Sequence, residues 1–138
     1  DAERQMMVAT TSSEEATPVQ VMTAEELRAA QTLVRRLPVG ESVVEAILAI
    51  VRAGRPETSD LDEVVEHVGW GPGPRASQAL MLTCRARALI DGRLSPSLDD
   101  AVALAKPVLQ HRMALKFAAR HSGVTVDSII DLLCQRIA

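Results

Sequence analysis

Arg75 is the residue of this sequence whose type and position most favour chemistry. It lies in the segment GWGPGPRASQA (69–79), directly after Pro74. Proline suits the first position of a helix because its fixed φ is already helical. Arg75 would then stand in the first turn, where the helix dipole is positive and disfavours an exposed cation by roughly 0.3–1 kcal/mol. A bound anion would offset that cost, and phosphate is bound well by both helix N-termini and arginine.

Two interpretations of this segment are open from the residues alone. In the first, the glycines let the backbone approach an anion closely and the prolines fix the angle of approach. That interpretation predicts a binding helix start formed by Gly73, Pro74, Arg75 and Ala76. In the second, Arg75 pairs with a surface carboxylate and the GPGP run is a plain turn.

Other residue patterns that support catalysis are missing. The sequence has no G-x-x-x-x-G-K-[ST] loop, no G-x-S-x-G elbow and no H-E-x-x-H pair. The acidic residues are explained without chemistry, as helix-start residues (Asp99 and Asp100) or as the solvated face of a short helix (Asp60, Asp62, Glu63 and Glu66). The histidines are scattered without companions at metal-ligand spacing, namely His67, His111 and His121. We therefore predict no catalytic residue and no metal site in this chain.

Composition predicts one helical domain. Hydrophobic residues make up 47% of the 138 residues, but aromatic residues only 1%, so the core must consist of aliphatic side chains. A core of this composition suits helices packed on helices better than sheets. The net charge of −3 gives no basic field for nucleic acid. Cys84 and Cys134 are predicted to be free, buried thiols in a cytoplasmic protein, and no apolar run approaches a membrane span.

Periodicity and end signals predict a small all-α bundle of about five or six helices. The segment 22–37 has a capping box of Thr23 and Glu26, and a second helix follows over 41–52, ended by Gly54. Further helices are expected over 59–68, over 74–90 up to Gly92, from the caps Ser95 or Ser97 onward, and after Thr125. Pro107 is expected to kink or restart its helix. Residues 3–8 could form a helix end, and 10–18 (TTSSEEATP) resembles a linker.

The order of these motifs resembles the lid subdomain of MoxR-family AAA+ ATPases. The family pattern G-x-x-P-R-A-s corresponds to residues 71–77, and a glycine-arginine turn to Gly92 and Arg93. A helix cap (SPSLDDAV, 95–102) and a P-V-L-x-H-R segment (107–112) follow. MTAEELRAAQTLVRRLPV (22–39) is similar to the first lid helix. The resemblance covers residues 22–113 and divides the chain into 1–21, a linker or the end of a preceding core domain, and 22–138, the lid.

The resemblance implies a lid behind a larger nucleotide-binding core in the same chain. Arg75 falls on the sensor-2 arginine, which reaches the γ-phosphate of ATP and reports the nucleotide state. The parent protein would use ATP and Mg²⁺, form a ring-shaped homo-oligomer, commonly a hexamer, and act as a chaperone-like remodeler. A protein with a von Willebrand factor A domain is an expected partner. The Walker A and B motifs, sensor 1 and the arginine finger are absent, so this chain by itself should neither hold ATP tightly nor hydrolyse it.

Two other functions fit parts of the sequence. A free-standing helical adaptor that binds a partner helix would explain the apolar content without nucleotide. DNA binding by a helix-turn-helix would use the cluster Arg75, Arg85, Arg87 and Arg93, but the acidic balance of the chain opposes it.

Overall fold

The computed structural model describes residues 1–12 and 17–137, with seven α-helices, one 3-10 helix and two short strands in that part of the chain. It divides into two compact units, residues 1–30 and 31–138. The predicted all-α class is thus confirmed. No helix in the described ranges is long and apolar enough to cross a membrane.

The first unit contains little buried surface. Its helix α1 spans Ala2–Thr11 and has no buried residue. The predicted linker therefore begins later than expected, because Thr10 and Thr11 belong to α1 and their hydroxyls donate to Met6 and Met7 carbonyls. The middle of that predicted linker lies outside the described residues. Helix α2 (Ala24–Arg36) begins in this unit with the predicted capping box, in which the Thr23 N–H donates to Glu26 Oε2 (2.7 Å) and the Glu26 N–H to Thr23 Oγ1 (3.1 Å).

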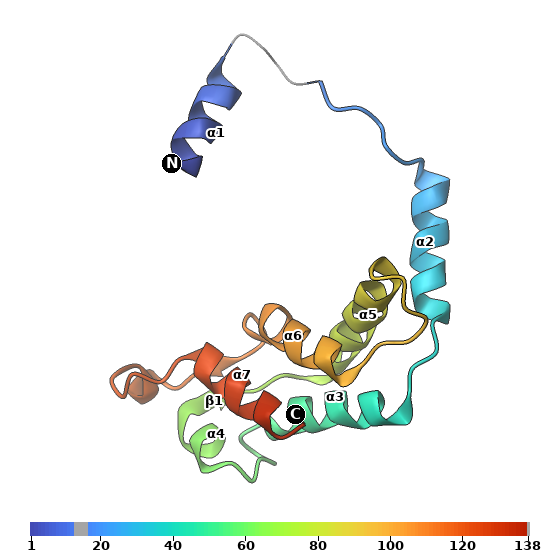
Figure 1. Ribbon diagram of the computed structural model, residues 1–138. Helices are drawn as coiled ribbons and strands as arrows, with labels where there is room; N and C mark the ends of the chain where they lie inside the picture. The colour runs from blue at the N-terminus through green and yellow to red at the C-terminus, as the bar shows by residue number, and fades with distance from the viewer. Residues whose placement is uncertain (13–16, 138) are drawn as a thin grey trace. The chain divides into compact units, whose positions relative to one another are not determined.

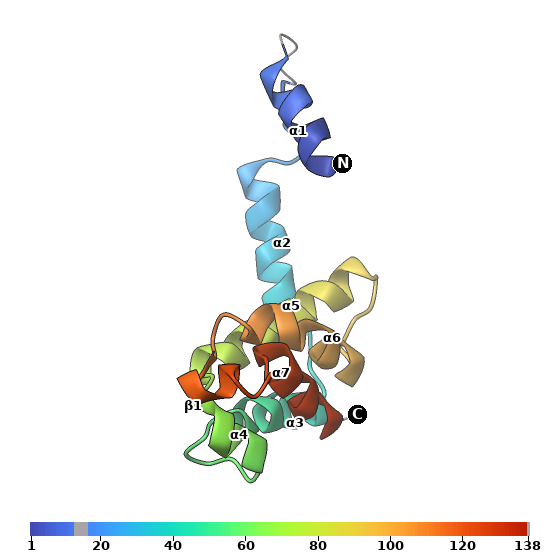
Figure 2. The ribbon, with the colours of Figure 1, turned by 90° about the vertical axis from the view of Figure 1, so that its left-hand side faces the viewer.

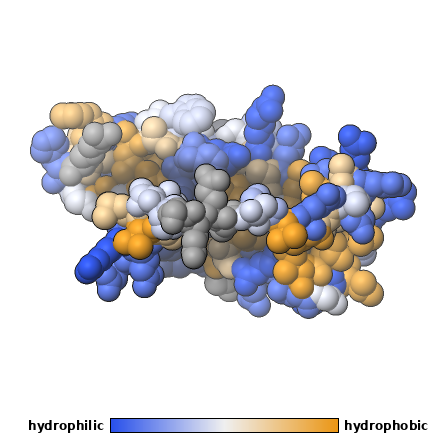
Figure 3. Space-filling view, turned by 90° about the horizontal axis from the view of Figure 1, so that it is seen from above, coloured by the Kyte–Doolittle hydropathy of each residue, from blue (hydrophilic) through white to orange (hydrophobic). Residues whose placement is uncertain are grey.

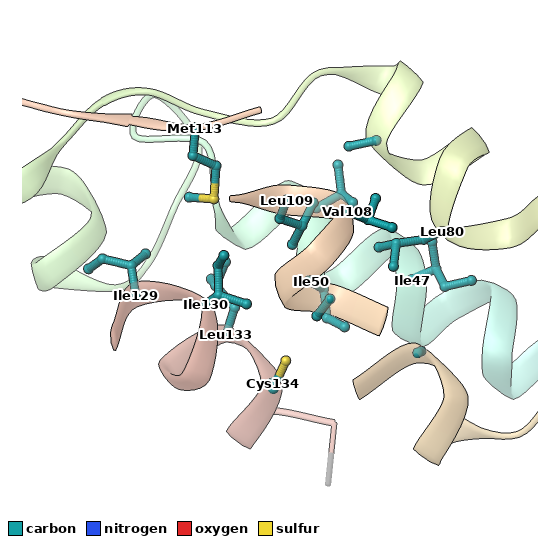
Figure 4. Packing of buried hydrophobic residues seen from close by; sticks show 14 of the residues in the cluster. Ile47, Ile50, Leu80, Val108, Leu109, Met113, Ile129, Ile130, Leu133 and Cys134 are labelled. Carbon is teal, nitrogen blue, oxygen red and sulfur yellow. The ribbon is translucent and has the colours of Figure 1, made fainter. Parts of the chain in front are cut away.

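The second unit is built on four helices. They are α3 (Glu41–Ala53), α5 (Pro74–Ile90), α6 (Leu98–Leu109) and α7 (Val126–Gln135), and two ribbon views show them gathered together (Figures 1 and 2). Helix α5 packs against α6 and α3, and α7 packs against α6. The aliphatic core predicted from composition lies between them, and its labelled side chains point toward one another in Figure 4: Ile47, Ile50, Leu80, Val108, Leu109, Met113, Ile129, Ile130, Leu133 and Cys134.

The apolar stripe of α2 is not part of this core. No residue of α2 is buried, and Leu27 and Leu33 are about half exposed at 50% and 48%. Apolar groups are also visible between polar ones on the face shown in Figure 3. Sequence periodicity thus identified the helix, but the described part of the chain does not bury its stripe.

The helix boundaries follow local signals closely. Helix α5 begins at Pro74 and ends before Gly92, which has a φ of +72°. Ser97 rather than Ser95 caps α6, and Thr125 caps α7 through a reciprocal pair of hydrogen bonds with Ser128. Each cap satisfies N–H groups that have no partner within the helix.

The α6 and α4 regions differ in part from what the sequence predicted. Of the two outcomes expected at Pro107, a restart does not occur, because α6 runs through this residue as one helix and ends at Leu109. The short helix α4 spans only Asp62–His67. Val68 instead begins strand β1 (Val68–Trp70), which pairs antiparallel with β2 (Ala114–Leu115). A 3-10 helix, η1 (Phe117–Arg120), follows β2.

Asp100 joins the end of α5 to the start of α6. Asp100 is 2% exposed. Its carboxylate accepts hydrogen bonds from both terminal nitrogens of Arg93, at 2.7 and 2.8 Å, and from the Ser97 N–H, at 2.8 Å. Arg87 Nε lies 3.3 Å from Asp100 Oδ1. The Arg93 hydrogen bonds lower the pKa of Asp100 to about 2, against the opposing effect of burial, with a further lowering from the Ser97 N–H. Asp100 is thus a helix-start residue, as predicted, and also a buried ion-pair centre, which was not predicted.

We expect this ion pair to make stability depend on acid pH. The pKa of Asp100 is lower in the folded chain than its ordinary 3.8, so its contribution is complete above about pH 4 and is lost as the pH falls through about 2. Urea unfolding of the wild type and of Asp100→Asn between pH 5 and pH 2 should show their difference in unfolding free energy shrinking by on the order of 2 kcal/mol. A difference that stays constant over this range would contradict the assignment, because the asparagine side chain of the variant cannot titrate.

Candidate functional site

The segment before α5 is held against the C-terminus of α3. Pro72 is among the fully buried side chains, and its carbonyl accepts the Nε–H of Arg55 at 2.9 Å. Gly54 ends α3 as predicted, but with a right-handed φ of −78°. Its missing side chain matters for packing, since a Cβ there would lie 3.1 Å from the Pro72 ring and 3.2 Å from Leu133. The segment GPGP (71–74) is therefore packed against the end of α3 just before α5 begins.

Gly71 is required by a close approach of two backbones. A Cβ at this position would overlap the Gly54 carbonyl oxygen and would lie 2.8 Å from Arg55 Cα. Contacts this short to backbone atoms cannot be relieved by rotating a side chain. Gly73 differs, because a Cβ there would meet no atom within 4 Å. Gly71 thus allows the two backbones to pack closely, whereas Gly73 leaves open space at the helix start.

We predict that Gly71→Ala destabilises the domain by about 1–3 kcal/mol, the usual cost of forcing atoms into packed space. Gly73→Ser is the matched control, since it adds a side chain in open space at a position where serine is a good N-cap. Its unfolding midpoint in urea should equal or exceed that of the wild type. Equal stability of Gly71→Ala and the wild type would contradict the backbone contact.

Arg75 is exposed at the first turn of α5. Gly73 is the extended N-cap residue (φ −84°, ψ −177°), Pro74 occupies the first helical position, and no side chain caps the helix. Ala76 is fully buried and its N–H donates to the Gly73 carbonyl at 2.9 Å. The buried Ala76 fixes the helix start to the core while the neighbouring Arg75 side chain faces solvent.

Arg75 has no carboxylate partner among the described residues. The plain turn predicted a carboxylate partner, but within the described residues no hydrogen bond or ion pair involves the Arg75 side chain. Its guanidinium can therefore present its donors to a ligand, beside a helix end whose dipole is positive. This arrangement suits a phosphate or carboxylate group brought by another domain or molecule.

The other arginines of the predicted cluster do not form a free basic surface. Arg87 and Arg93 both pair with Asp100 and Asp91. Arg85 is partly buried, and its Nε is a buried atom without a hydrogen-bond partner in the described chain. Because these charges are used or covered internally, the cluster offers little to the backbone of DNA. Sequence reasoning missed the Arg93–Asp100 pair, although the glycine-arginine turn at Gly92 marked its position.

The remaining candidates are placed separately. His67 is half-buried, His111 contacts Arg112, and His121 lies against the Phe117 ring with centroids 5.4 Å apart. No group of three or more His, Cys, Asp or Glu residues in the described ranges could hold a metal ion. Asp60 pairs with Arg136, while the other acidic side chains of the α4 region are exposed.

The two cysteines are buried, whereas the single tryptophan is exposed. Cys84 and Cys134 are free and buried, as predicted, and burial raises the pKa of the Cys84 thiol to about 11. Burial also raises the pKa of the Cys134 thiol, so both thiols stay protonated at neutral pH. Trp70, whose environment the sequence did not define, lies at the end of β1 with 60% of its surface exposed.

Comparison with known proteins identifies the family of this chain. A family model described as AAA lid domain matches residues 63–133, and the chain belongs to this family. The matched range contains β1, α5 with Arg75, α6 and most of α7. The resemblance to the lid of MoxR-family AAA+ ATPases is thus confirmed.

Individual relatives agree with this assignment. The chain is 27% identical over 120 residues to "Chaperone MoxR1" of Mycobacterium tuberculosis, a match that covers 86% of this chain and 32% of the relative. A crystal structure of a candidate ATPase from Cytophaga hutchinsonii has the same fold, with a TM-score of 0.85 and 21% identity. That match covers 97% of this chain and 41% of the other. The chain therefore spans about a third to two fifths of the length of these relatives.

Proposed function

We propose that this chain is the nucleotide-sensing lid of an AAA+ ATPase, in which Arg75 acts as the sensor-2 arginine. The family membership of residues 63–133 supports a lid. The observation that carries the role of Arg75 is its exposed and unpaired guanidinium, within the described chain, at the uncapped start of α5. Removing that guanidinium from the natural full-length protein and measuring ATP turnover tests the proposal.

The residues present fit a role in contacting nucleotide but not in holding it alone. Arg75 would donate to a terminal phosphate oxygen, with Gly73, Pro74 and Ala76 setting its position at the helix start. The sequence has no Walker A loop to cradle a triphosphate, so ATP with Mg²⁺ would be held by the AAA+ core. ATP bound there would supply the phosphoanhydride bond that the parent protein hydrolyses.

Arg75 would then couple the lid to the nucleotide in two ways. Its charge offsets negative charge on the terminal phosphate, where charge-assisted hydrogen bonds are strong. Because Arg75 belongs to α5, a change at that phosphate would shift α5. The shift would reach the bundle because α5 packs against both α6 and α3. In this proposal residues 1–21 are the end of the core or a linker, and 22–138 form the lid.

The wider context of the parent protein is also a proposal. One relative is named a chaperone, which supports a chaperone-like remodeler, and the proposal places it in the cytoplasm. The AAA lid family implies association with an AAA+ core in the same chain. A ring-shaped homo-oligomer such as a hexamer, and a partner with a von Willebrand factor A domain, complete the proposal.

A further inference from the structure

The Arg55 side chain makes a hydrogen bond to the segment that precedes α5. It follows the last turn of α3, and its Nε–H donates to the carbonyl oxygen of Pro72 at 2.9 Å in a part-buried position. No ion pair involves the Arg55 side chain within the described residues. The charge is therefore directed at a backbone carbonyl of the segment that leads into α5.

The start of α5 needs support from outside the helix. Gly73 has no side chain to cap it, and the Ala76 N–H donates to the Gly73 carbonyl across this start. Helix ends without caps tend to fray because their N–H groups have no partners. The first turn, which contains Arg75, is therefore held by the buried Ala76 on its core side and, through Gly73 and Pro74, by whatever fixes the preceding residue.

Three contacts fix that preceding residue. The Pro72 ring is buried against Gly54, the Gly71 backbone approaches Gly54 and Arg55 closely, and Arg55 holds the Pro72 carbonyl. Of the three, only the Arg55 contact is made by a long side chain that can be removed without opening the core. The Pro72 carbonyl that Arg55 contacts lies three residues before Arg75, and the Pro74 between them has a fixed φ.

We propose that Arg55 is a positioning residue for Arg75: it acts as a tertiary cap that holds the first turn of α5 in place. This inference rests on the proposed nucleotide role of Arg75. Without Arg55, the Pro72 carbonyl would lose its partner and the first turn would fray, so Arg75 would meet its phosphate in fewer molecules and at a less defined angle.

The test is a double-mutant cycle in the natural full-length protein, with ATP turnover as the readout. Arg55→Ala should lower kcat roughly tenfold, since misplacing a group by about 1 Å can cost up to about 10²-fold. In an Arg75→Ala background, Arg55→Ala should lower kcat no further, because it acts through Arg75. Arg55→Lys, whose ammonium can still donate to the Pro72 carbonyl, should keep most of the turnover.

Two controls separate positioning from general loss of structure. Arg52→Ala removes an exposed arginine from the last turn of α3 and should leave turnover unchanged. Hydrogen–deuterium exchange of a peptide covering residues 73–80 should be faster in Arg55→Ala, with peptides from α6 and α7 unchanged. A merely destabilised fold would instead speed exchange throughout the bundle and lower kcat in both backgrounds.

The outcomes distinguish this inference from the proposed function. If Arg75→Ala lowers turnover but Arg55→Ala does not, or if the two effects are additive, the positioning role is wrong and the sensor role stands. Unchanged exchange at the start of α5 in Arg55→Ala also overturns the positioning role. If Arg75→Ala leaves turnover unchanged, the sensor role is wrong and the positioning role falls with it.

Discussion

Arg75→Ala should lower the ATP turnover of the natural full-length protein by roughly 10²-fold, the usual cost of removing one preorganised donor to developing charge. The side chain is exposed and makes no hydrogen bond or ion pair within the described residues, so its loss should not weaken the fold. Phosphate release under saturating ATP measures the loss of kcat. Urea unfolding of the 138-residue chain should give the same midpoint for the variant and the wild type.

A charge-preserving variant and a distant arginine sharpen this result. Arg75→Lys keeps the charge but loses the planar fork of donors, so it should recover only part of the turnover. Arg52→Ala removes a similarly exposed arginine from α3 and should have no effect. Full turnover in Arg75→Ala would rule out the sensor role, while the assignment of the chain to the AAA lid family would stand.

The second large effect concerns stability. Asp100→Asn should lower the free energy of unfolding at pH 7 by about 2–4 kcal/mol, because it removes a carboxylate that accepts two hydrogen bonds from Arg93 and caps α6 at the Ser97 N–H. For a domain of this size the melting temperature should fall by on the order of 10 °C. Circular dichroism at 222 nm during heating measures it.

Asp99→Asn is the matched control for this substitution. Asp99 is the preceding residue in the first turn of α6, and its side chain is exposed. Both substitutions remove one negative charge from the same helix start, so they weaken the dipole interaction to a similar extent. Equal melting temperatures for the two variants would show that the Arg93–Asp100 contacts add nothing beyond that interaction.

Much of the candidate site was predictable because its signals are local. Pro74 set the start of α5, and the charge after it marked Arg75 as a residue without an obvious structural role. The capping boxes at Thr23 and Thr125 likewise involve residues three apart, so a helix start can be read directly from the sequence. The composition indicated the helical class, since aromatic residues, which sheets favour, make up only 1% of the sequence.

What the sequence by itself determined about this protein is therefore its set of helices, several of their ends and the position of Arg75. Only the tertiary structure decided that Arg75 has no partner in the described chain, that Gly71 must lack a side chain beside Gly54, and that Asp100 holds Arg93. It also produced the pairing of β1 with β2, which joins residues as distant as Val68 and Leu115. The physical reason is that these features depend on which side chains and backbones meet in the folded chain, whether seven residues apart, as for Arg93 and Asp100, or far apart, as for β1 and β2.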